Sequence, residues 1–341
     1  MPSMVEALRN PAAFPEKTKR VEVLQTHIST VFRGDAFVYK VKKPVNFGFL
    51  DFSDLEKREY YCRQEVKLNQ RLSKDVYIGV LPILWDGENY HLRGGPGKVV
   101  DYAVKMKRVP DEKLMKSAFI RGELREHHLK RIAQVLAGFH LSALRTVEID
   151  EFGKPESFKV NTDENFDQVE RYMGKTIEDR AFEDLKAWTE RFYEENGQLF
   201  RRRIAEGRIR DCHGDLHMEH ICLTESLSIV DCIEFNDRFR YSDTIADTAF
   251  LLMDLEYHGG YDFSKLLWEY YKTEAMERGR EAEPLLTFYK VYRAFVRGKV
   301  NSFQLDDVHI HEKAKESARR TARKYFQLAY SYIASGSGAR S

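Results

Sequence analysis

The stretch CHGDLHMEHIC, Cys212–Cys222, gathers three histidines, two cysteines and an aspartate within eleven residues. This composition allows a zinc site, a catalytic loop or a polar turn. A structural zinc site usually has a second Cys-x-x-Cys or His-x3-His pair at finger spacing, and the sequence has none. The zinc interpretation therefore depends on His213, His217 and His220 meeting a metal ion by themselves.

The spacing around Asp215 favours a catalytic loop for phosphoryl transfer. That reaction needs a base for the acceptor hydroxyl, ligands for a metal ion, and a lysine on the nucleotide phosphates. Asp215 follows His213, and Asp231 ends the strand-like SIVD sixteen residues later. Protein kinases have a similar layout, with a metal-binding asparagine five residues after the base. Here that fifth residue is His220.

Three motifs resemble the aminoglycoside phosphotransferase and choline kinase family: HGDLHMEH (213–220), VDCIEFND (230–237) and YSDTIADTAFLLMDL (241–255). The motif VYKVKKPVNFGFLDFSDLE (38–56) is similar to the phosphotransferase half of bacterial bifunctional aminoglycoside phosphotransferase/ATP-binding proteins, which carry a P-loop domain downstream. The resemblance covers roughly residues 20–335. It implies a protein kinase-like fold and phosphoryl transfer from ATP or GTP, and it names no acceptor.

The resemblance implies a role for each polar residue of these motifs. Asp215 would be the catalytic base that accepts the proton of the substrate hydroxyl or orients it, and His213 would brace the loop. Asp231 would hold Mg²⁺ or Mn²⁺, because carboxylate oxygens are hard donors. His220 stands at the place of the metal-binding asparagine. Glu234 would either reach the metal or substrate or form a structural salt bridge.

Further along the chain, Asp247 lies within the apolar helical segment 244–255. By resemblance, this buried aspartate accepts hydrogen bonds from the backbone of the catalytic loop. Arg293 and Arg297 are four residues apart in a helical pattern. They could face a substrate, but we interpret them as a solvated basic helix face.

Lys40 lies in the apolar strand FVYKV, residues 37–41, where a lysine needs an anionic partner. The helix that follows supplies one, because Glu65 falls within the same arc as its apolar residues. A buried carboxylate without a cation is costly, so we predict an ion pair between Lys40 and Glu65. This pair matches the lysine–glutamate pair of the kinase fold. Lys42 shares the strand face of Lys40 and is the alternative partner.

The nucleotide would also contact residues at both ends of the strand region. The segment His27–Thr30 stands where many kinases have a glycine-rich turn, although it contains no glycine. Ser29 and Thr30 could offer hydroxyl and backbone donors to phosphate, or be ordinary turn residues. Adenine would lie against the backbone near Met106 and Val109.

The first third of the sequence favours strands, at 21–32, 36–43 and within 88–109, where Gly-Gly-Pro-Gly joins two of them. A capping box, Ser53 to Glu56, begins a helix that runs to about Leu72. After Val109 the pattern is helical, except for a strand-like segment at 221–235. The predicted helices are 123–145, 163–206, 243–258, 262–278, 284–303 and 309–334.

These elements predict an α+β, bilobal protein kinase-like fold. Residues 1–108 would form a nucleotide-binding lobe with an antiparallel sheet and one helix. Residues 109–334 would form a larger helical lobe for catalysis and substrate, and 335–341, SGSGARS, a flexible tail.

Composition excludes several classes of function. The 55 basic and 54 acidic residues create no global field toward nucleic acid or membrane. No apolar run approaches the ~18–20 residues of a membrane span, and the N-terminus lacks a secretory pattern. The four cysteines (62, 212, 222 and 232) fit reduced thiols, so we expect a cytoplasmic protein.

Two questions stay open from the sequence. The missing asparagine and glycines allow a catalytically inactive nucleotide-binding protein of the same fold. The acceptor is unnamed, since the acidic residues Asp254, Glu256 and Asp262 are interpreted as surface.

Overall fold

The computed structural model describes residues 3–277, 282–307 and 310–337. The chain divides into two units by its internal contacts. The N-terminal unit comprises Met1–Leu124 and Glu219–Asp237, and the C-terminal unit comprises Arg125–Met218 and Arg238–Ser341. The N-terminal unit therefore extends beyond the boundary predicted at residue 108, and it includes the segment that follows the predicted catalytic loop.

An antiparallel sheet forms the frame of the N-terminal unit. Among the described residues it has six strands, in the order β1-β2-β3-β6-β4-β5. The predicted strand 21–32 is two strands, because the chain turns at Thr26–Ile28. The strands are β1 (Glu22–Gln25), β2 (Ser29–Arg33), β3 (Phe37–Lys42), β4 (Tyr77–Trp85), β5 (Tyr90–His91) and β6 (Lys98–Lys107).

The prediction that residues 88–109 form a two-stranded hairpin is wrong, because strand β4 lies between the two strands. Both β5 and β6 pair with β4, so Gly94–Gly97 connects strands that are not neighbours. The sequence of β4, YIGVLPILW, contains Gly79 and Pro82, which are unusual inside strands. Irregularities in the β4–β6 register fall beside Gly79 and at Ile83/Leu84.

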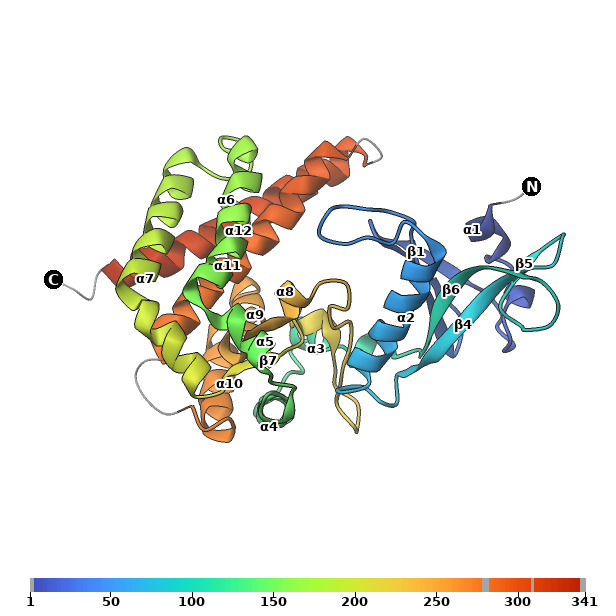
Figure 1. The fold of residues 1–341 in the computed structure, drawn as a ribbon, viewed down its shortest axis with the longest axis horizontal. Helices are drawn as coiled ribbons and strands as arrows, with labels where there is room; N and C mark the ends of the chain where they lie inside the picture. The colour runs from blue at the N-terminus through green and yellow to red at the C-terminus, as the bar shows by residue number, and fades with distance from the viewer. Residues whose placement is uncertain (1–2, 278–281, 308–309, 338–341) are drawn as a thin grey trace. The chain divides into compact units, whose positions relative to one another are not determined.

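Helix α2 (Leu55–Asn69) packs against β4 and β6 (Figure 1). Its N-cap is Asp54, whose side chain accepts a hydrogen bond from the backbone N–H of Lys57 at 2.8 Å. The predicted capping residue, Ser53, instead donates to Asp51. The apolar face of α2 meets the sheet in a cluster of buried residues, Cys62, Val76, Tyr77 and Val104.

The segment after the predicted catalytic loop forms a short hairpin rather than a continuous strand. Its strands are β8 (Ile221–Cys222) and β9 (Ser228–Ile229). Backbone hydrogen bonds from Leu223 to Lys113 (2.7 Å) and from Ile229 to Leu72 (3.2 Å) fasten it to the N-terminal unit. The short helices α1 (Met4–Ala7), η1 (Pro11–Ala13), η2 (Asp111–Lys113), α3 (Met115–Ile120) and η5 (Met218–His220) complete this part of the fold.

The C-terminal unit is mainly helical. Its longer helices are α4 (Glu126–Ser142), α6 (Pro155–Val169), α7 (Asp179–Ala205), α9 (Thr244–Tyr257), α10 (Tyr261–Glu274), α11 (Ala282–Phe303) and α12 (Glu312–Ser337). Figure 1 shows α6, α7, α11 and α12 packed together, around a core that includes Phe166, Phe182, Phe295 and Phe326. Shorter elements are α5 (Val147–Asp150), η3 (Glu151–Gly153), η4 (Glu170–Tyr172), α8 (Asp237–Arg240), η6 (Gln304–Asp306) and the paired strands β7 (Ile209–Asp211) and β10 (Tyr241–Asp243).

Two predictions about these helices are wrong in detail. The single helix predicted at 163–206 is broken between α6 and α7, where Gly174 has a left-handed φ of 70°. The predicted tail, 335–341, begins inside α12, which reaches Ser337, and residues 338–341 lie outside the described part of the chain.

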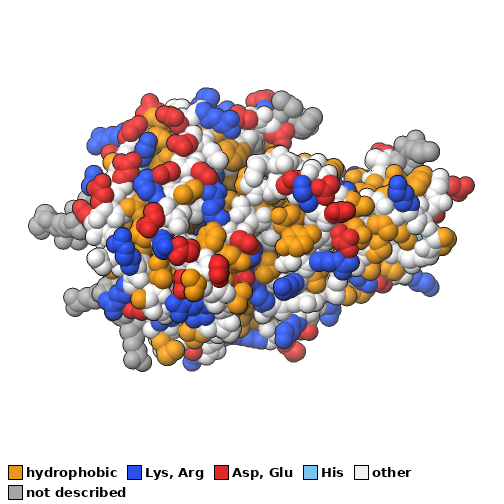
Figure 2. Space-filling view, in the orientation of Figure 1, with side chains coloured by type: hydrophobic (Ala, Val, Ile, Leu, Met, Phe, Trp, Pro, Cys, Tyr) orange, Lys and Arg blue, Asp and Glu red, His pale blue; other side chains and the backbone are white. Residues whose placement is uncertain are grey.

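All four cysteines are buried, and none of them forms a disulfide within the described residues. Within the described ranges, the helices are too short or too polar to cross a membrane. Basic and acidic side chains alternate over the face seen in Figure 2, with hydrophobic side chains between them. That face therefore carries no field of a single sign.

Candidate active site

Asp231 directly follows the β8–β9 hairpin, and its backbone is held in an unusual conformation. Its φ is 63°, in the left-handed region that aspartate tolerates better than most side chains. The backbone N–H of Asp231 donates to the Tyr77 hydroxyl at 3.2 Å, and that of Cys232 donates to Asn69 Oδ1 at 2.9 Å. Side chains of the sheet and of α2 thus hold the backbone of this turn in place. Such strained positions concentrate at functional sites.

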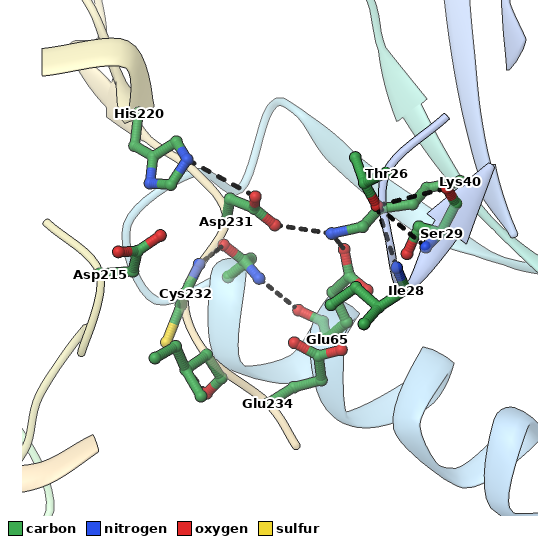
Figure 3. A network of polar contacts seen from close by, with 12 residues as sticks. Thr26, Ile28, Ser29, Lys40, Glu65, Asp215, His220, Asp231, Cys232 and Glu234 are labelled. Atoms are coloured by element: carbon green, nitrogen blue, oxygen red, sulfur yellow. Dashed lines mark hydrogen bonds and ion pairs between the residues drawn. The ribbon is translucent and has the colours of Figure 1, made fainter. Parts of the chain in front are cut away.

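The carboxylate of Asp231 is well exposed and has two charged or basic neighbours (Figure 3). Lys40 Nζ donates to Oδ1 at 2.6 Å, and His220 Nε2 lies 3.5 Å from Oδ2. A carboxylate oxygen and an imidazole nitrogen at this separation are a donor set that suits a divalent cation. Two of the three residues predicted at a metal site, Asp231 and His220, are therefore neighbours in the fold.

Lys40 and Glu65 are in contact, as the apolar strand and helix pattern predicts. Lys40 Nζ lies 3.0 Å from Glu65 Oε1. Burial by itself would lower the pKa of Lys40, but Asp231 and Glu65 hold it well above its usual value. Burial would raise the pKa of Glu65, but Lys40 and Lys42 hold it below its usual value. Both side chains are therefore charged.

Lys42 has a larger role than the sequence indicates. It is fully buried, donates to Glu65 Oε2 at 2.7 Å, and also binds Glu234 Oε1. Glu234 is buried beside Lys42, so its contacts are those of the structural salt bridge, the second of its two predicted roles. Burial raises the pKa of Glu234.

The hairpin predicted to cover the phosphates has a different tip from the one expected. Ser29 and Thr30 lie in strand β2 and are buried, whereas the turn itself is Thr26–Ile28. Thr26 Oγ1 accepts hydrogen bonds from the backbone N–H groups of Ile28 (3.3 Å) and Ser29 (3.0 Å), as Figure 3 shows. Ser29 Oγ has no hydrogen-bond partner among the described residues.

Met106 and Val109, predicted near adenine, lie at the end of β6 and just beyond it. Both pack against the apolar cluster beneath α2. Val230, the residue before Asp231, packs against the same cluster. The apolar wall and the polar group at Asp231 are thus parts of one unit.

In the C-terminal unit, Asp247 binds the backbone of the predicted catalytic loop, as expected from the sequence. Its two carboxylate oxygens accept the backbone N–H groups of His213 (2.9 Å) and Gly214 (2.8 Å). Burial alone would raise the pKa of Asp247, but a hydrogen bond from His140 and the His213 contacts lower it below its usual range. Asp247 is therefore an anion inside an apolar helix.

The prediction of a solvated basic face on α11 is wrong. Arg293 is buried, and its guanidinium donates to the backbone carbonyls of Gly214 (3.0 Å) and Ala246 (3.2 Å). The guanidinium of Arg297 lies over the Tyr325 ring, 5.6 Å from its centroid. Arg293 thus binds the carbonyl of Gly214, whose N–H is bound by Asp247.

Three further polar residues surround the loop without having been predicted there. His140 Nε2 lies 3.2 Å from Asp247, and its Nδ1 lies 2.7 Å from the Tyr271 hydroxyl. Asp254, interpreted as a surface residue, is buried and accepts the Met218 N–H at 3.0 Å. Its spacing of seven residues from Asp247, two turns along the same helix, is the signal that could have placed it.

Asp215 itself is only partly buried and lies beside two histidines. Its backbone N–H donates to His213 Nδ1 at 3.3 Å, so His213 braces the loop. His217 Nε2 is 3.6 Å from Asp215 Oδ2. Burial would lower the pKa of His217, but the charge of Asp215 raises it above its usual value.

Comparison with known sequences places these motifs in a family. Residues 50–282 match the phosphotransferase enzyme family. Uncharacterized proteins of Mycobacterium tuberculosis and Mycobacterium bovis are each 34% identical to this chain over 283 residues, which is 82% of the chain. The match covers 54% of those proteins, so the chain spans about half the length of these relatives.

Solved structures show the same fold at low sequence identity. An amicoumacin kinase in complex with AMP-PNP and Ca²⁺ has a TM-score of 0.53 at 10% identity, covering 96% of this chain and 94% of its own. The GDP complex of aminoglycoside 2'-phosphotransferase-IIIa has a TM-score of 0.52 at 13% identity, covering 96% and 99%. A choline/ethanolamine kinase family protein from Mesorhizobium loti has a TM-score of 0.50 at 15% identity, covering 97% and 99%.

These likenesses confirm the predicted α+β, protein kinase-like fold. The family match covers the helix with Glu65, the predicted catalytic loop, Asp231 and Asp247. The chain belongs to the phosphotransferase enzyme family.

Proposed function

We propose that this protein transfers the γ-phosphoryl group of ATP or GTP to a hydroxyl of a small molecule. The observation that carries the proposal is the exposed Asp231 carboxylate, held in a left-handed turn with Lys40 at 2.6 Å and His220 at 3.5 Å. A bound triphosphate needs a lysine beside its phosphates and two protein ligands for a divalent metal ion, and these groups lie together here. Family membership supports the same reaction.

Each residue has a distinct role in this proposal. Asp231 and His220 would hold a divalent cation, Mg²⁺ or Mn²⁺, which neutralises charge on the phosphate oxygens. Lys40 would bind the phosphates, and Glu65 would orient Lys40. Asp215 would accept the proton of the acceptor hydroxyl, or orient that hydroxyl for attack.

The remaining predicted contacts belong to the nucleotide. The hairpin that contains Ser29 and Thr30 would cover the phosphates, and the backbone near Met106 and Val109 would face adenine. The reaction consumes a nucleoside triphosphate, and the chain's thiols fit a reducing compartment, so we propose a cytoplasmic location.

The acceptor is proposed only as a chemical class. The similar solved structures are named as kinases of choline or ethanolamine, of aminoglycosides and of amicoumacin. Because those likenesses extend to the fold alone, we propose a hydroxylated small molecule without choosing among amino alcohols, sugars, nucleosides and aminoglycosides.

Release of ADP during a screen of hydroxylated metabolites tests this function. With an acceptor identified, Asp215→Ala should lower kcat at least ~10²-fold, the low end of general-base effects. Full activity of Asp215→Ala would remove Asp215 from the role of base. Tight ATP binding with no turnover on any acceptor, and no ATP hydrolysis, would instead favour an inactive nucleotide-binding protein.

A further inference from the structure

Five charged side chains of the N-terminal unit touch one another, and burial divides them into two groups. The inner trio is Lys42, Glu65 and Glu234, whose side chains are 1%, 0% and 4% exposed. The outer pair is Lys40 and Asp231, at 14% and 44% exposed. Of these five, the outer pair is what a ligand from solvent can reach.

The two oxygens of Glu65 are used differently. Oε2 accepts a well-formed hydrogen bond of 2.7 Å from Lys42. Oε1 lies 3.0 Å from Lys40 Nζ but lacks a hydrogen bond of good geometry. The directional bond of Lys40 goes instead to Asp231 at 2.6 Å. Glu65 therefore accepts its hydrogen bond of good geometry from Lys42, while its contact with Lys40 is an ion pair alone.

We propose that Lys42, and not Lys40, is the lysine that anchors helix α2 to the sheet, and that it also positions Asp231 by holding Glu234. Lys42 is then a positioning residue for phosphoryl transfer. Lys40 is left to exchange its bond with Asp231 for bonds to the nucleotide phosphates, a step that rests on the proposed function.

The spacing of the partners supports this division of labour. Lys40 and Lys42 are two residues apart and share one face of β3. Asp231 and Glu234 are three apart on the segment that faces them, so two parallel contacts tie this segment to the strand. Asn69 adds a third tie, because its Oδ1 accepts the Cys232 N–H while its Nδ2 donates to the Glu65 carbonyl.

The charge balance predicts a larger loss of stability for removal of Lys42 than for removal of Lys40. The inner trio holds one cation and two anions. Removing Lys42 leaves two buried carboxylates facing each other, which is the costly way to break a buried ion pair. Removing Lys40 takes a cation from Glu65 Oε1, but Lys42 stays bound to the same carboxylate, and Asp231 already faces water.

Thermal unfolding of the ligand-free protein tests the proposal. Lys42→Met should lower the midpoint by roughly 5–15 °C. The matched variant, Lys40→Met, should shift it far less. In double-mutant cycles with Glu65→Gln, the coupling to Lys42 should exceed the coupling to Lys40. Equal destabilisation by the two lysine variants, or stronger coupling of Glu65 to Lys40, would overturn the proposal.

A second variant covers the case in which Lys42→Met does not fold. Lys42→Met with Glu234→Gln removes one cation and one anion, so Glu65 keeps Lys40 as its only charge partner within this group. This double variant should regain most of the lost stability, and a double variant no more stable than Lys42→Met would contradict the role of Glu234.

Binding of a fluorescent ATP analogue separates this inference from the proposed function. Lys40→Met should weaken binding by at least ~10-fold, because a charged hydrogen bond to phosphate is lost. The charge-balanced Lys42→Met/Glu234→Gln variant should bind more tightly than Lys40→Met, and weaker binding would count against the inference. If the wild-type protein does not bind the analogue, the proposed function fails, while the unfolding data still decide which lysine anchors α2.

Discussion

At the scale of single residues, the backbone and the side chain of Asp231 have different partners. Its left-handed φ is 63°, and the Tyr77 hydroxyl and Asn69 Oδ1 accept hydrogen bonds from the main-chain N–H groups of Asp231 and Cys232. The carboxylate is left to Lys40 and His220. Asp231→Asn is therefore a cleaner variant than Asp231→Ala, because asparagine also tolerates the left-handed region.

His220 is the residue whose chemistry departs from the kinase pattern. Imidazole suits transition metals better than Mg²⁺, so the wild-type protein should prefer Mn²⁺ or Co²⁺. His220→Asn should move the preference toward Mg²⁺, since an amide oxygen is a hard donor. Mn²⁺ and Mg²⁺ titrations of both proteins, followed by nucleotide binding at a fixed pH of 8, measure the change. An unchanged preference would mean that His220 has no role at the metal.

Predictability from sequence differed among the site residues for a physical reason. The contacts of Glu65 and Asp247 could be predicted, because a carboxylate inside an apolar helix pattern needs a hydrogen-bonding or charged partner. Arg293 was not, since a long basic side chain on a helix is usually solvated, and its acceptor at Gly214 lies 79 residues away in the sequence. The roles proposed for Asp215, Asp231 and Lys40 in catalysis stay predictions.

At the scale of elements, local patterns predicted the existence of most helices but failed where tertiary contacts decide. Strand β4 carries Gly79 and Pro82, which argue against a strand locally, yet it lies inside the sheet between β6 and β5. The break between α6 and α7 contains no proline, and its stop signal is Gly174. A single glycine inside a helical pattern is weak evidence for a break.

Helices α11 and α12 pack closely at Gly298. A Cβ atom there would lie 2.7 Å from ring carbons of Phe326, which is buried. Gly298→Ala should therefore lower the free energy of unfolding by about 1–3 kcal/mol, because overpacking outweighs the better helix propensity of alanine.

Gly197 in α7 is the matched control, since a Cβ there would meet only Arg201 Nη1 at 3.8 Å. Gly197→Ala should raise stability by about 1 kcal/mol. Denaturant unfolding of both variants gives the comparison, and a stabilised Gly298→Ala protein would show that the α11–α12 contact can relax.

Lys299 links α11 to α6 and should make stability depend on pH. Its Nζ donates to Asn165 Oδ1 (2.6 Å) and Gln168 Oε1 (2.9 Å), and burial lowers its pKa to about 8. The unfolded chain then binds more protons than the folded one between pH 8 and about 10.5, so stability should rise across this window.

The gain relative to Lys299→Met should reach up to about 3 kcal/mol. Urea unfolding at pH 7.5 and pH 10 measures it for both proteins. Parallel pH dependences for wild type and variant would exclude a lowered pKa at Lys299.

At the scale of the whole molecule, a nearly neutral chain is organised as two units, each with its own polar centre. The N-terminal unit holds the Asp231 group and the C-terminal unit holds the loop fastened by Asp247 and Arg293. Buried charged residues are therefore present in both units. Because a ligand that binds the folded state stabilises it, ligand binding should raise the overall stability of the protein.

ATP with a divalent cation should stabilise the protein against heat. A ligand that binds only the folded state adds about 2.7 kcal/mol at a hundredfold excess over its Kd. Differential scanning fluorimetry should show a rise in Tm with ATP and Mn²⁺ or Mg²⁺, a smaller rise with EDTA present, and little or none for Lys40→Met. A Tm that is insensitive to millimolar nucleotide would argue against a nucleotide site.

Because its four cysteines are buried, the folded protein should react very slowly with thiol-reactive dyes. Burial raises the pKa of Cys62 to about 12 and that of Cys222 to about 11, so both thiols are protonated and inert at neutral pH. One cysteine placed at Glu88, in the N-terminal unit, and one at Glu190, in the C-terminal unit, would then take a donor and an acceptor fluorophore without removal of the native cysteines. Energy transfer between the two dyes would test, in real time, whether addition of nucleotide and acceptor alters the distance between the two labels.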